Sequence, residues 1–158
     1  MYDTFSNIDL VAPYAAKVGS TISPATQRLP FPEGVTDKMN MSRTLCNDII
    51  KYSDLPYRRR LLIIPTAWGG TGFIINNWKK GDKCYEINKS AINDVLSVPV
   101  DPTNALNKLC GFFWYQGESD IQANNPTYNL SFDQFLKDLK IDIYGNQFND
   151  NFVNISGF

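Results

Sequence analysis

Two short apolar runs, each followed at once by glycine-rich or polar residues, constrain the fold of this chain more than any other feature. They cover residues 61–64 and 109–115, and branched or aromatic side chains dominate both. Runs of this length, bounded by turn signals, are typical of strands buried on both faces of a sheet. Parallel strands need crossover connections, so we expect helices to alternate with these runs.

Apolar residues recur at helical spacing in three segments around the two runs. The first lies between capping candidates at residues 36–37 and Pro56, the second covers residues 88–96, and the third starts at Ser131, which has a glutamine at capping-box spacing. Residues 152–155 have the composition of a last short strand. This alternation predicts an α/β fold, a three-layer α/β/α sandwich around a parallel sheet.

The chain has 158 residues, which suits one domain with a substantial core. Prolines and glycines punctuate residues 1–35, and we expect this stretch to be an irregular surface excursion that carries at most short elements. The sequence therefore predicts a single domain or domain fragment, 1–158, with its α/β core in residues 36–158.

The charge and apolar patterning exclude two classes of partner. The 15 basic and 16 acidic residues give a net charge of −1, which is not the electrostatic footprint of a nucleic-acid-binding protein. No apolar run reaches the roughly 18 residues of a membrane helix, and the polar start of the sequence does not resemble a signal peptide. We expect no nucleic acid and no membrane as partners, and the sequence assigns no compartment.

The chain contains no histidine. A Ser-His-Asp triad and every His-ligated metal site are therefore impossible within these residues. The three cysteines are far apart and form no Cys-x-x-Cys pair, so we expect buried, reduced thiols, no metal and no cofactor. Cys110 lies inside an apolar run and is expected to be buried.

Two segments rich in ligand-binding groups follow the expected strands. Residues 69–72 read Gly-Gly-Thr-Gly, and residues 116–120 read Gln-Gly-Glu-Ser-Asp. Ligands of open parallel sheets bind outside the carboxyl ends of the strands. We therefore expect the two loops to lie side by side at one rim of the sheet and to direct their hydrogen-bond donors toward a shared anion pocket.

Each segment has a structural and a functional interpretation. The glycines form either a tight turn or a backbone that approaches a ligand and directs amide N–H groups at it. The second segment is either a solvated loop or a site in which the Gln116 amide donates to a developing oxyanion, while Glu118 and Asp120 orient neighbours or act as acids.

Three tryptophans, Trp68, Trp78 and Trp114, are candidates for a sugar-binding surface. Their large rings combine an apolar face with a polar N–H group. Core packing is the favoured role for Trp114, which lies within the apolar run 109–115.

At these residues the sequence resembles the sialate O-acetylesterase-like branch of the SGNH (GDSL-type) hydrolases, which are carbohydrate acetylesterases. The matching text is Ile-Ile-Pro-Thr-Ala-Trp-Gly-Gly-Thr at residues 63–71, Trp78, and Phe-Trp-Tyr-Gln-Gly-Glu-Ser-Asp at residues 113–120. The resemblance covers roughly residues 36–143. It implies an SGNH-like sandwich of flavodoxin-like topology and an acetylated carbohydrate as substrate.

The resemblance also implies roles for individual residues. Gly70, or its neighbour Gly69, would donate a backbone N–H to the oxyanion hole, and Gln116 would donate a side-chain N–H. Glu118 and Asp120 would hold their loop in shape. Apart from the resemblance, we expect Gly69 and Thr71 to orient the glycine turn, and the rings of Trp68 and Trp78 to contact the sugar.

Two blocks of the family have no match here. The Gly-Gln-Ser-Asn block, which carries the nucleophile in the family, is matched only in its last two residues, at Ser6-Asn7. The Asp-x-x-His block is absent. We therefore expect a domain truncated at both ends, which by itself has little or no esterase activity because a serine without a base is a weak nucleophile. A sheet edge left open in this way invites a partner chain or a second copy.

Two alternatives stay open beside the acetylesterase or acetylesterase fragment. One is a non-catalytic sugar-binding or structural module derived from an SGNH hydrolase, for example in a viral particle. The other is a glycosidase that uses Glu118 with a second carboxylate across a cleft, which requires carboxyl groups about 5–9.5 Å apart.

Overall fold

The computed structural model describes residues 8–11, 22–24, 42–52, 61–97, 107–145 and 153–155. The chain divides into two compact units, Met1–Ala67 and Trp68–Phe158. The expectation of a single domain stays a prediction, and each unit is described by itself below.

The first unit contains a small mixed sheet and one helix. Its elements are β1 (Ile8–Val11), β2 (Ile22–Pro24), α1 (Ser42–Tyr52) and β3 (Leu61–Ile63), and the strand order in the sheet is β2-β1-β3. β1 is antiparallel to β2 and parallel to β3, with Ile8 opposite Leu61. The crossover that a parallel pair requires contains α1, which confirms the expected helix. Its expected caps at residues 36–37 lie outside the described residues.

Two short strands, β1 and β2, lie within residues 1–35, where the sequence predicted at most short elements. β1 is hydrogen-bonded to both β2 and β3, so part of this stretch belongs to a sheet. The apolar residues Ile8, Leu10 and Val11 are the local signal for this strand.

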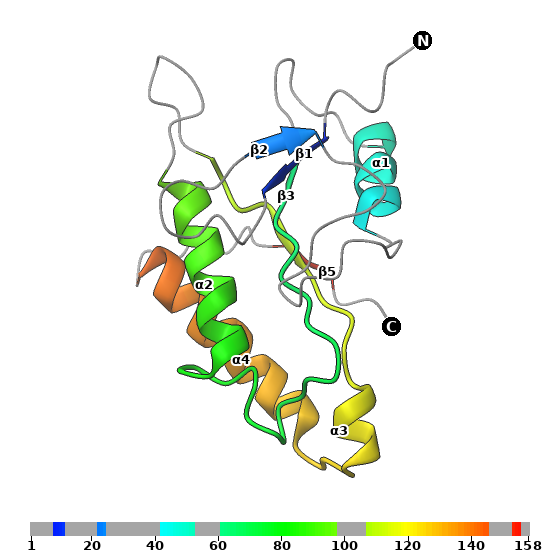
Figure 1. The fold of residues 1–158 in the computed structure, drawn as a ribbon, viewed down its shortest axis with the longest axis vertical. Coiled ribbons are helices and arrows are strands. Elements are labelled where there is room, and N and C mark those ends of the chain that lie inside the picture. The colour runs from blue at the N-terminus through cyan, green and yellow to red at the C-terminus, as the bar shows by residue number, and fades with distance from the viewer. Residues whose placement is uncertain are drawn as a thin grey trace. The chain divides into compact units, whose positions relative to one another are not determined.

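The second unit contains three helices, which Figure 1 labels, and a parallel strand pair. Its elements are α2 (Lys83–Leu96), β4 (Gly111–Phe113), α3 (Glu118–Gln122), α4 (Tyr128–Tyr144) and β5 (Val153–Ile155). β4 is parallel to β5, with Gly111 opposite Val153, which confirms the expected last strand. Helices and parallel strand pairs together give an α/β fold. No helix in the described part of the chain has the length and apolarity to cross a membrane.

An aromatic cluster forms the core of the second unit. Phe135 of α4 is 1% exposed, and its ring lies 5.1 Å from Trp114 and 6.1 Å from both Phe73 and Trp78, measured between centroids. Most of these contacts are tilted or edge-to-face, the geometry that the ring quadrupoles favour. The segments before α2 and after β4 are thus anchored on one helix.

The helices of this unit differ at their starts from the expected ones. α2 begins five residues before the expected residue 88, because Cys84 and Tyr85 continue its buried stripe. α4 begins at Tyr128, so the expected capping box at Ser131 was wrong: Ser131 N–H donates to the Thr127 carbonyl as in a helix interior. The side chain of Gln134 donates onward to Asp138 at 2.9 Å and does not turn back to a cap.

β4 confirms the strand expected within residues 109–115. The expectation that this strand is buried on both faces is not confirmed. Phe113 is 39% exposed, and Cys110 is exposed where the apolar run predicted a buried thiol. Cys84 is buried and Cys46 is half-buried, and burial raises the pKa of the Cys46 thiol to about 11. All three cysteines are free, in agreement with the expected reduced state.

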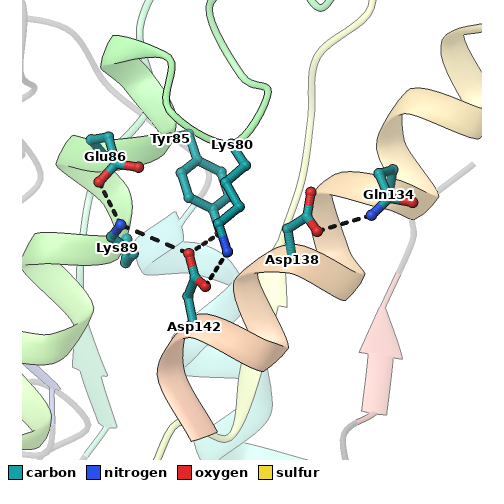
Figure 2. A network of polar contacts seen from close by, with 7 residues as sticks. All are labelled: Lys80, Tyr85, Glu86, Lys89, Gln134, Asp138 and Asp142. Carbon is teal, nitrogen blue, oxygen red and sulfur yellow. Dashed lines mark hydrogen bonds and ion pairs between the residues drawn. The ribbon is translucent and has the colours of Figure 1, made fainter. Parts of the chain in front are cut away.

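A group of charged and polar side chains joins α2 to α4 (Figure 2). The Asp142 carboxylate accepts hydrogen bonds from Lys80 at 2.5 Å and from the Tyr85 hydroxyl at 2.8 Å. Lys89 lies 3.7 Å from Asp142 and 2.5 Å from Glu86. The hydrogen bond from Lys80, followed by that from Tyr85, holds the pKa of Asp142 below its ordinary value. These contacts fix the two helices beside one another.

Candidate functional site

The two sequence segments singled out above are in contact within the second unit. The side-chain amide of Gln116 donates to the Thr71 carbonyl at 2.9 Å and to Asp120 Oδ2 at 2.9 Å. Forty-five residues separate Gln116 from Thr71. The expectation that the glycine turn and the loop after β4 lie side by side is therefore correct for the described residues.

Asp120 is the centre of this contact. Its side chain is 1% exposed, and its carboxylate accepts backbone N–H bonds from Phe73 and Ile74, both at 3.0 Å. The amides of Gln116 and Asn125 donate to the same carboxylate at 2.9 Å and 2.7 Å. Burial by itself raises the pKa of Asp120, but these four hydrogen bonds outweigh it and the pKa lies below its ordinary value. The group is an ionised carboxylate that holds both loops.

The glycine turn is closed by its own threonine. Thr71 Oγ1 donates to the Trp68 carbonyl at 2.7 Å and accepts from Trp78 Nε1 at 2.8 Å. Gly70, at φ +66°, is exposed, and in the part of the chain that is described its N–H has no hydrogen-bond partner. A left-handed backbone and an N–H without a partner among the described residues agree with both interpretations of this turn, a tight bend and a donor for a ligand.

Gly72 is required by the contact with Asp120. A Cβ added at Gly72 would lie 2.8 Å from Asp120 Oδ2, closer than any real Cβ contact. The N–H of Gly72 donates to Asn77 Oδ1 at 3.0 Å. The last glycine of the motif thus lets the backbone that continues into Phe73 and Ile74 approach the Asp120 carboxylate.

The backbone of Gln116 is held from the opposite side by α4. Tyr128 at the start of α4 donates its hydroxyl to the Gln116 carbonyl at 2.5 Å and accepts from Trp114 Nε1 at 3.0 Å. Burial raises the pKa of Tyr128, so the hydroxyl stays protonated and remains a donor. Gln116 is therefore fixed at its backbone and at its side chain.

The remaining expected site residues separate into three groups. Glu118 is exposed and its carboxylate accepts only the neighbouring Gly117 N–H, at 3.1 Å, among the described residues. Trp78 is 3% exposed, so the expectation that its ring contacts a sugar was wrong, and the ring belongs to the core like that of Trp114. Trp68 is half-buried, and the ammonium of Lys83 lies 4.3 Å from its ring centroid. Gly69 is exposed.

Two residues of this arrangement, Asn125 and Tyr128, were not expected from the sequence. Asn125 precedes Pro126, a turn signal directly after the Gln-Gly-Glu-Ser-Asp segment. Its N–H donates to the Asp120 carbonyl at 2.9 Å, and its side chain accepts from Thr127, the residue before α4. The Asn125-Pro126 pair indicates a turn, but no local sequence pattern shows which carboxylate the Asn125 side chain binds.

The described residues do not favour the glycosidase alternative or a metal site. Asp120 is buried and fully engaged, so it does not face a sugar across a cleft from Glu118. Among the described residues there is no group of three or more histidine, cysteine or acidic side chains that could hold a metal ion.

Comparison with protein-family models gives one match. The model of the carbohydrate esterases described as sialic acid-specific acetylesterases matches residues 25–156. The comparisons with curated proteins and with solved structures found no match. The matched range includes both loops joined by Asp120 and the helix that holds Gln116. The chain belongs to the carbohydrate esterase family of sialic acid-specific acetylesterases.

Proposed function

We propose that this chain provides the oxyanion-binding side of a carbohydrate O-acetylesterase, with the Gly70 backbone N–H and the Gln116 side-chain amide as donors. The substrate class is an O-acetylated carbohydrate, in keeping with the family description. The observation that carries the proposal is the 2.9 Å hydrogen bond from Gln116 Nε2 to the Thr71 carbonyl, which brings the amide to the residue after Gly70.

The Gln116 amide has to exchange one internal hydrogen bond before it can act. Both of its N–H groups are engaged, one by the Thr71 carbonyl and one by the Asp120 carboxylate. The bond to a charged acceptor is the stronger of the two. We therefore propose that the bond to Thr71 is exchanged when an oxyanion forms, since the charged oxygen of the tetrahedral intermediate is a better acceptor than a neutral carbonyl.

Asp120 supports this exchange by keeping the amide oriented. Its carboxylate retains one Gln116 N–H and holds Phe73 and Ile74, which follow the glycine turn. A donor that is positioned before the reaction needs no reorganisation as charge develops. Glu118, which is exposed, has no part in this support beyond its bond to Gly117.

The nucleophile and base are not assigned within these residues. The chain has no histidine, so a Ser-His-Asp triad requires a residue from outside the 158 considered. Trp68, half-buried beside the glycine turn, is the proposed sugar contact. The three-layer sandwich and the single domain belong to the same proposal, supported by the parallel pairing of β1 with β3 and of β4 with β5.

A sugar-binding module without catalysis is the second candidate. The engagement of both Gln116 N–H groups and the lack of histidine favour it. In this case the acetyl group adds nothing to recognition, because the Gln116 amide keeps its internal hydrogen bonds and does not turn to the acetyl oxygen.

Amide NMR of the chain titrated with an O-acetylated sugar and with its deacetylated form tests the proposal. We expect the Gly70 N–H and the Gln116 side-chain amide to shift with the acetylated sugar only. Gln116→Ala should weaken its binding by about fivefold, the loss of one hydrogen bond, and Gln134→Ala, a matched change on α4, should not. Equal binding of both sugars would favour the sugar-binding module, and binding of neither would refute both candidates.

A further inference from the structure

Tyr128, at the start of α4, contacts both loops of the candidate site. Its hydroxyl donates to the Gln116 carbonyl at 2.5 Å. Its ring lies edge-to-face against Phe73, with 5.7 Å between the ring centroids. A Cβ added at Gly117 would lie 3.6 Å from Tyr128 Cζ, so the backbone after Gln116 passes over the same ring. Because Phe73 follows the glycine turn, one side chain contacts two segments that are far apart in the sequence.

The partners of the Tyr128 hydroxyl fix the direction of its hydrogen bonds. Trp114 Nε1 can only donate, and it lies 3.0 Å from the hydroxyl oxygen. A carbonyl oxygen can only accept, so the single hydroxyl proton points to Gln116. The ring of Trp114 is buried and packs against Phe135. The backbone of Gln116 is therefore anchored, through Tyr128, on the aromatic core.

This anchor does not use the Gln116 side chain. The side-chain amide donates to the Thr71 carbonyl and to the Asp120 carboxylate, and under the proposed function the bond to Thr71 is exchanged for one to the ligand. That exchange removes a direct bond between the two loops. The contacts of Tyr128 with Gln116 and Phe73 remain, and together with Asp120 they keep the released amide beside the glycine turn. Tyr128 therefore matters more in the complex than in the free chain.

We propose that Tyr128 is a positioning residue for acetyl recognition, and that its hydroxyl holds the Gln116 backbone so that the released amide reaches the acetyl oxygen. This inference rests on the proposed function and adds a residue to it. Tyr128 acts through Gln116 and does not itself contact the ligand. Loss of the hydroxyl then weakens recognition of the acetyl group and leaves recognition of the sugar ring unchanged.

Isothermal titration of Tyr128→Phe with O-acetylated N-acetylneuraminic acid and with its deacetylated form tests this role. The substitution removes the hydroxyl and keeps the ring beside Phe73 and Gly117. We expect about fivefold weaker binding of the acetylated sugar, the effect of one hydrogen bond, and unchanged binding of the deacetylated form. Tyr144→Phe is the matched control, because it removes a hydroxyl that donates to the Leu109 carbonyl at the other end of α4. This control should bind both sugars as the unmodified chain does.

The failures of the two proposals are distinct. A folded Tyr128→Phe variant that keeps the full preference for the acetylated sugar would overturn the role of Tyr128 and leave the proposed carbohydrate site intact. An equal loss of preference in Tyr144→Phe would also overturn this role, because the effect would then follow general stability. An unmodified chain without any preference would overturn the proposed function, and the role of Tyr128 with it.

Circular dichroism of each variant checks that the fold is retained. If Tyr128→Phe does not fold, the NMR signal of the Trp114 indole N–H in the unmodified chain decides the question. This N–H donates to the Tyr128 hydroxyl, which in turn donates to Gln116, and hydrogen bonds in such a chain polarise one another. A shift of the signal with the acetylated sugar only would support the role of Tyr128, and any other response would contradict it.

Discussion

Replacing the Asp120 carboxylate by an amide is the sharpest test of how the two loops are held. In Asp120→Asn one of the two terminal atoms becomes an N–H₂ group that no longer accepts hydrogen bonds. Oδ1 accepts from Ile74 and Asn125, and Oδ2 accepts from Phe73 and Gln116. Either orientation of the new amide therefore leaves two donors without an acceptor.

The expected loss of stability follows from this arrangement. Each hydrogen bond to a charged group contributes about 1.5–3 kcal/mol. The loss of two such bonds lowers the free energy of unfolding by about 3–6 kcal/mol. Rotation of the two side-chain amides to other partners recovers part of this energy, so we expect a net loss of about 3 kcal/mol. This is a large fraction of the roughly 5–15 kcal/mol that stabilises a typical domain.

Urea denaturation followed by tryptophan fluorescence measures this loss, because Trp78 and Trp114 lie in the aromatic core. Asp133→Asn, an exposed aspartate on α4, is the matched control and should change stability by less than about 0.5 kcal/mol. An Asp120→Asn variant as stable as this control would refute the conclusion that the buried carboxylate joins the loops.

The pH dependence of the free energy of unfolding is a second test of the role of Asp120. The pKa of Asp120 is lowered in the folded chain, so its stabilising contribution is complete above the unfolded pKa of about 3.9 and is lost as the pH falls through the folded value. We expect the unmodified chain to lose stability in this acidic range. Asp120→Asn should be less stable at neutral pH but should show a smaller loss on acidification.

The remaining predictions concern packing, the helix pair, activity and assembly. Gly72→Ala should destabilise the chain by about 1–3 kcal/mol, because the new Cβ meets Asp120 at 2.8 Å, whereas Gly111→Ala, with open space, should have little effect in the same urea assay. Asp142→Asn should flatten the acid side of the melting-temperature profile, since Lys80 and Tyr85 lower the pKa of Asp142 and this contribution is lost only as the pH falls through that value; an unchanged profile would contradict it. The chain alone should hydrolyse p-nitrophenyl acetate little faster than buffer does, and clear turnover that disappears in Gln116→Ala would show that it is catalytic by itself. Size-exclusion chromatography should detect a dimer or a bound partner at the sheet edge, and a stable monomer would argue against one.

The sequence predicted which helices and strands are present better than it predicted the residues at which they begin and end. The strands at β3, β4 and β5 and the helices α1, α2 and α4 all fall within or beside the expected segments. The start of α4 was predicted too late, because the residue spacing of a capping box, seen at Ser131, also occurs inside helices. β1 and β2 were missed because three apolar residues in β1 (Ile-Asp-Leu-Val) and one isoleucine in β2 (Ile-Ser-Pro) are a weak signal until another strand pairs with them.

The candidate site was predicted in its location but not in its bonding. Residue types alone placed Gln116 and the glycine turn together. They could not show that both Gln116 N–H groups are engaged, that Trp78 is buried, or that Asp120 and not Glu118 joins the loops. The bond from Gln116 to Thr71 and the bonds from Phe73 and Ile74 to Asp120 join residues 45 to 47 positions apart, which no local pattern shows.

The amino-acid order by itself determined the α/β alternation, the absence of histidine chemistry and the presence of two motifs suited to an oxyanion, since each is a local or compositional property. The tertiary structure alone decided which donors are free and which charges are paired. Among the described residues the Gly70 N–H has no hydrogen-bond partner while both side-chain N–H groups of Gln116 are engaged, and Lys80 is paired with Asp142 while Lys83 lies over Trp68. Hydrogen bonds and ion pairs depend on distances of about 3–4 Å, and residues distant in sequence reach these only when the chain has folded.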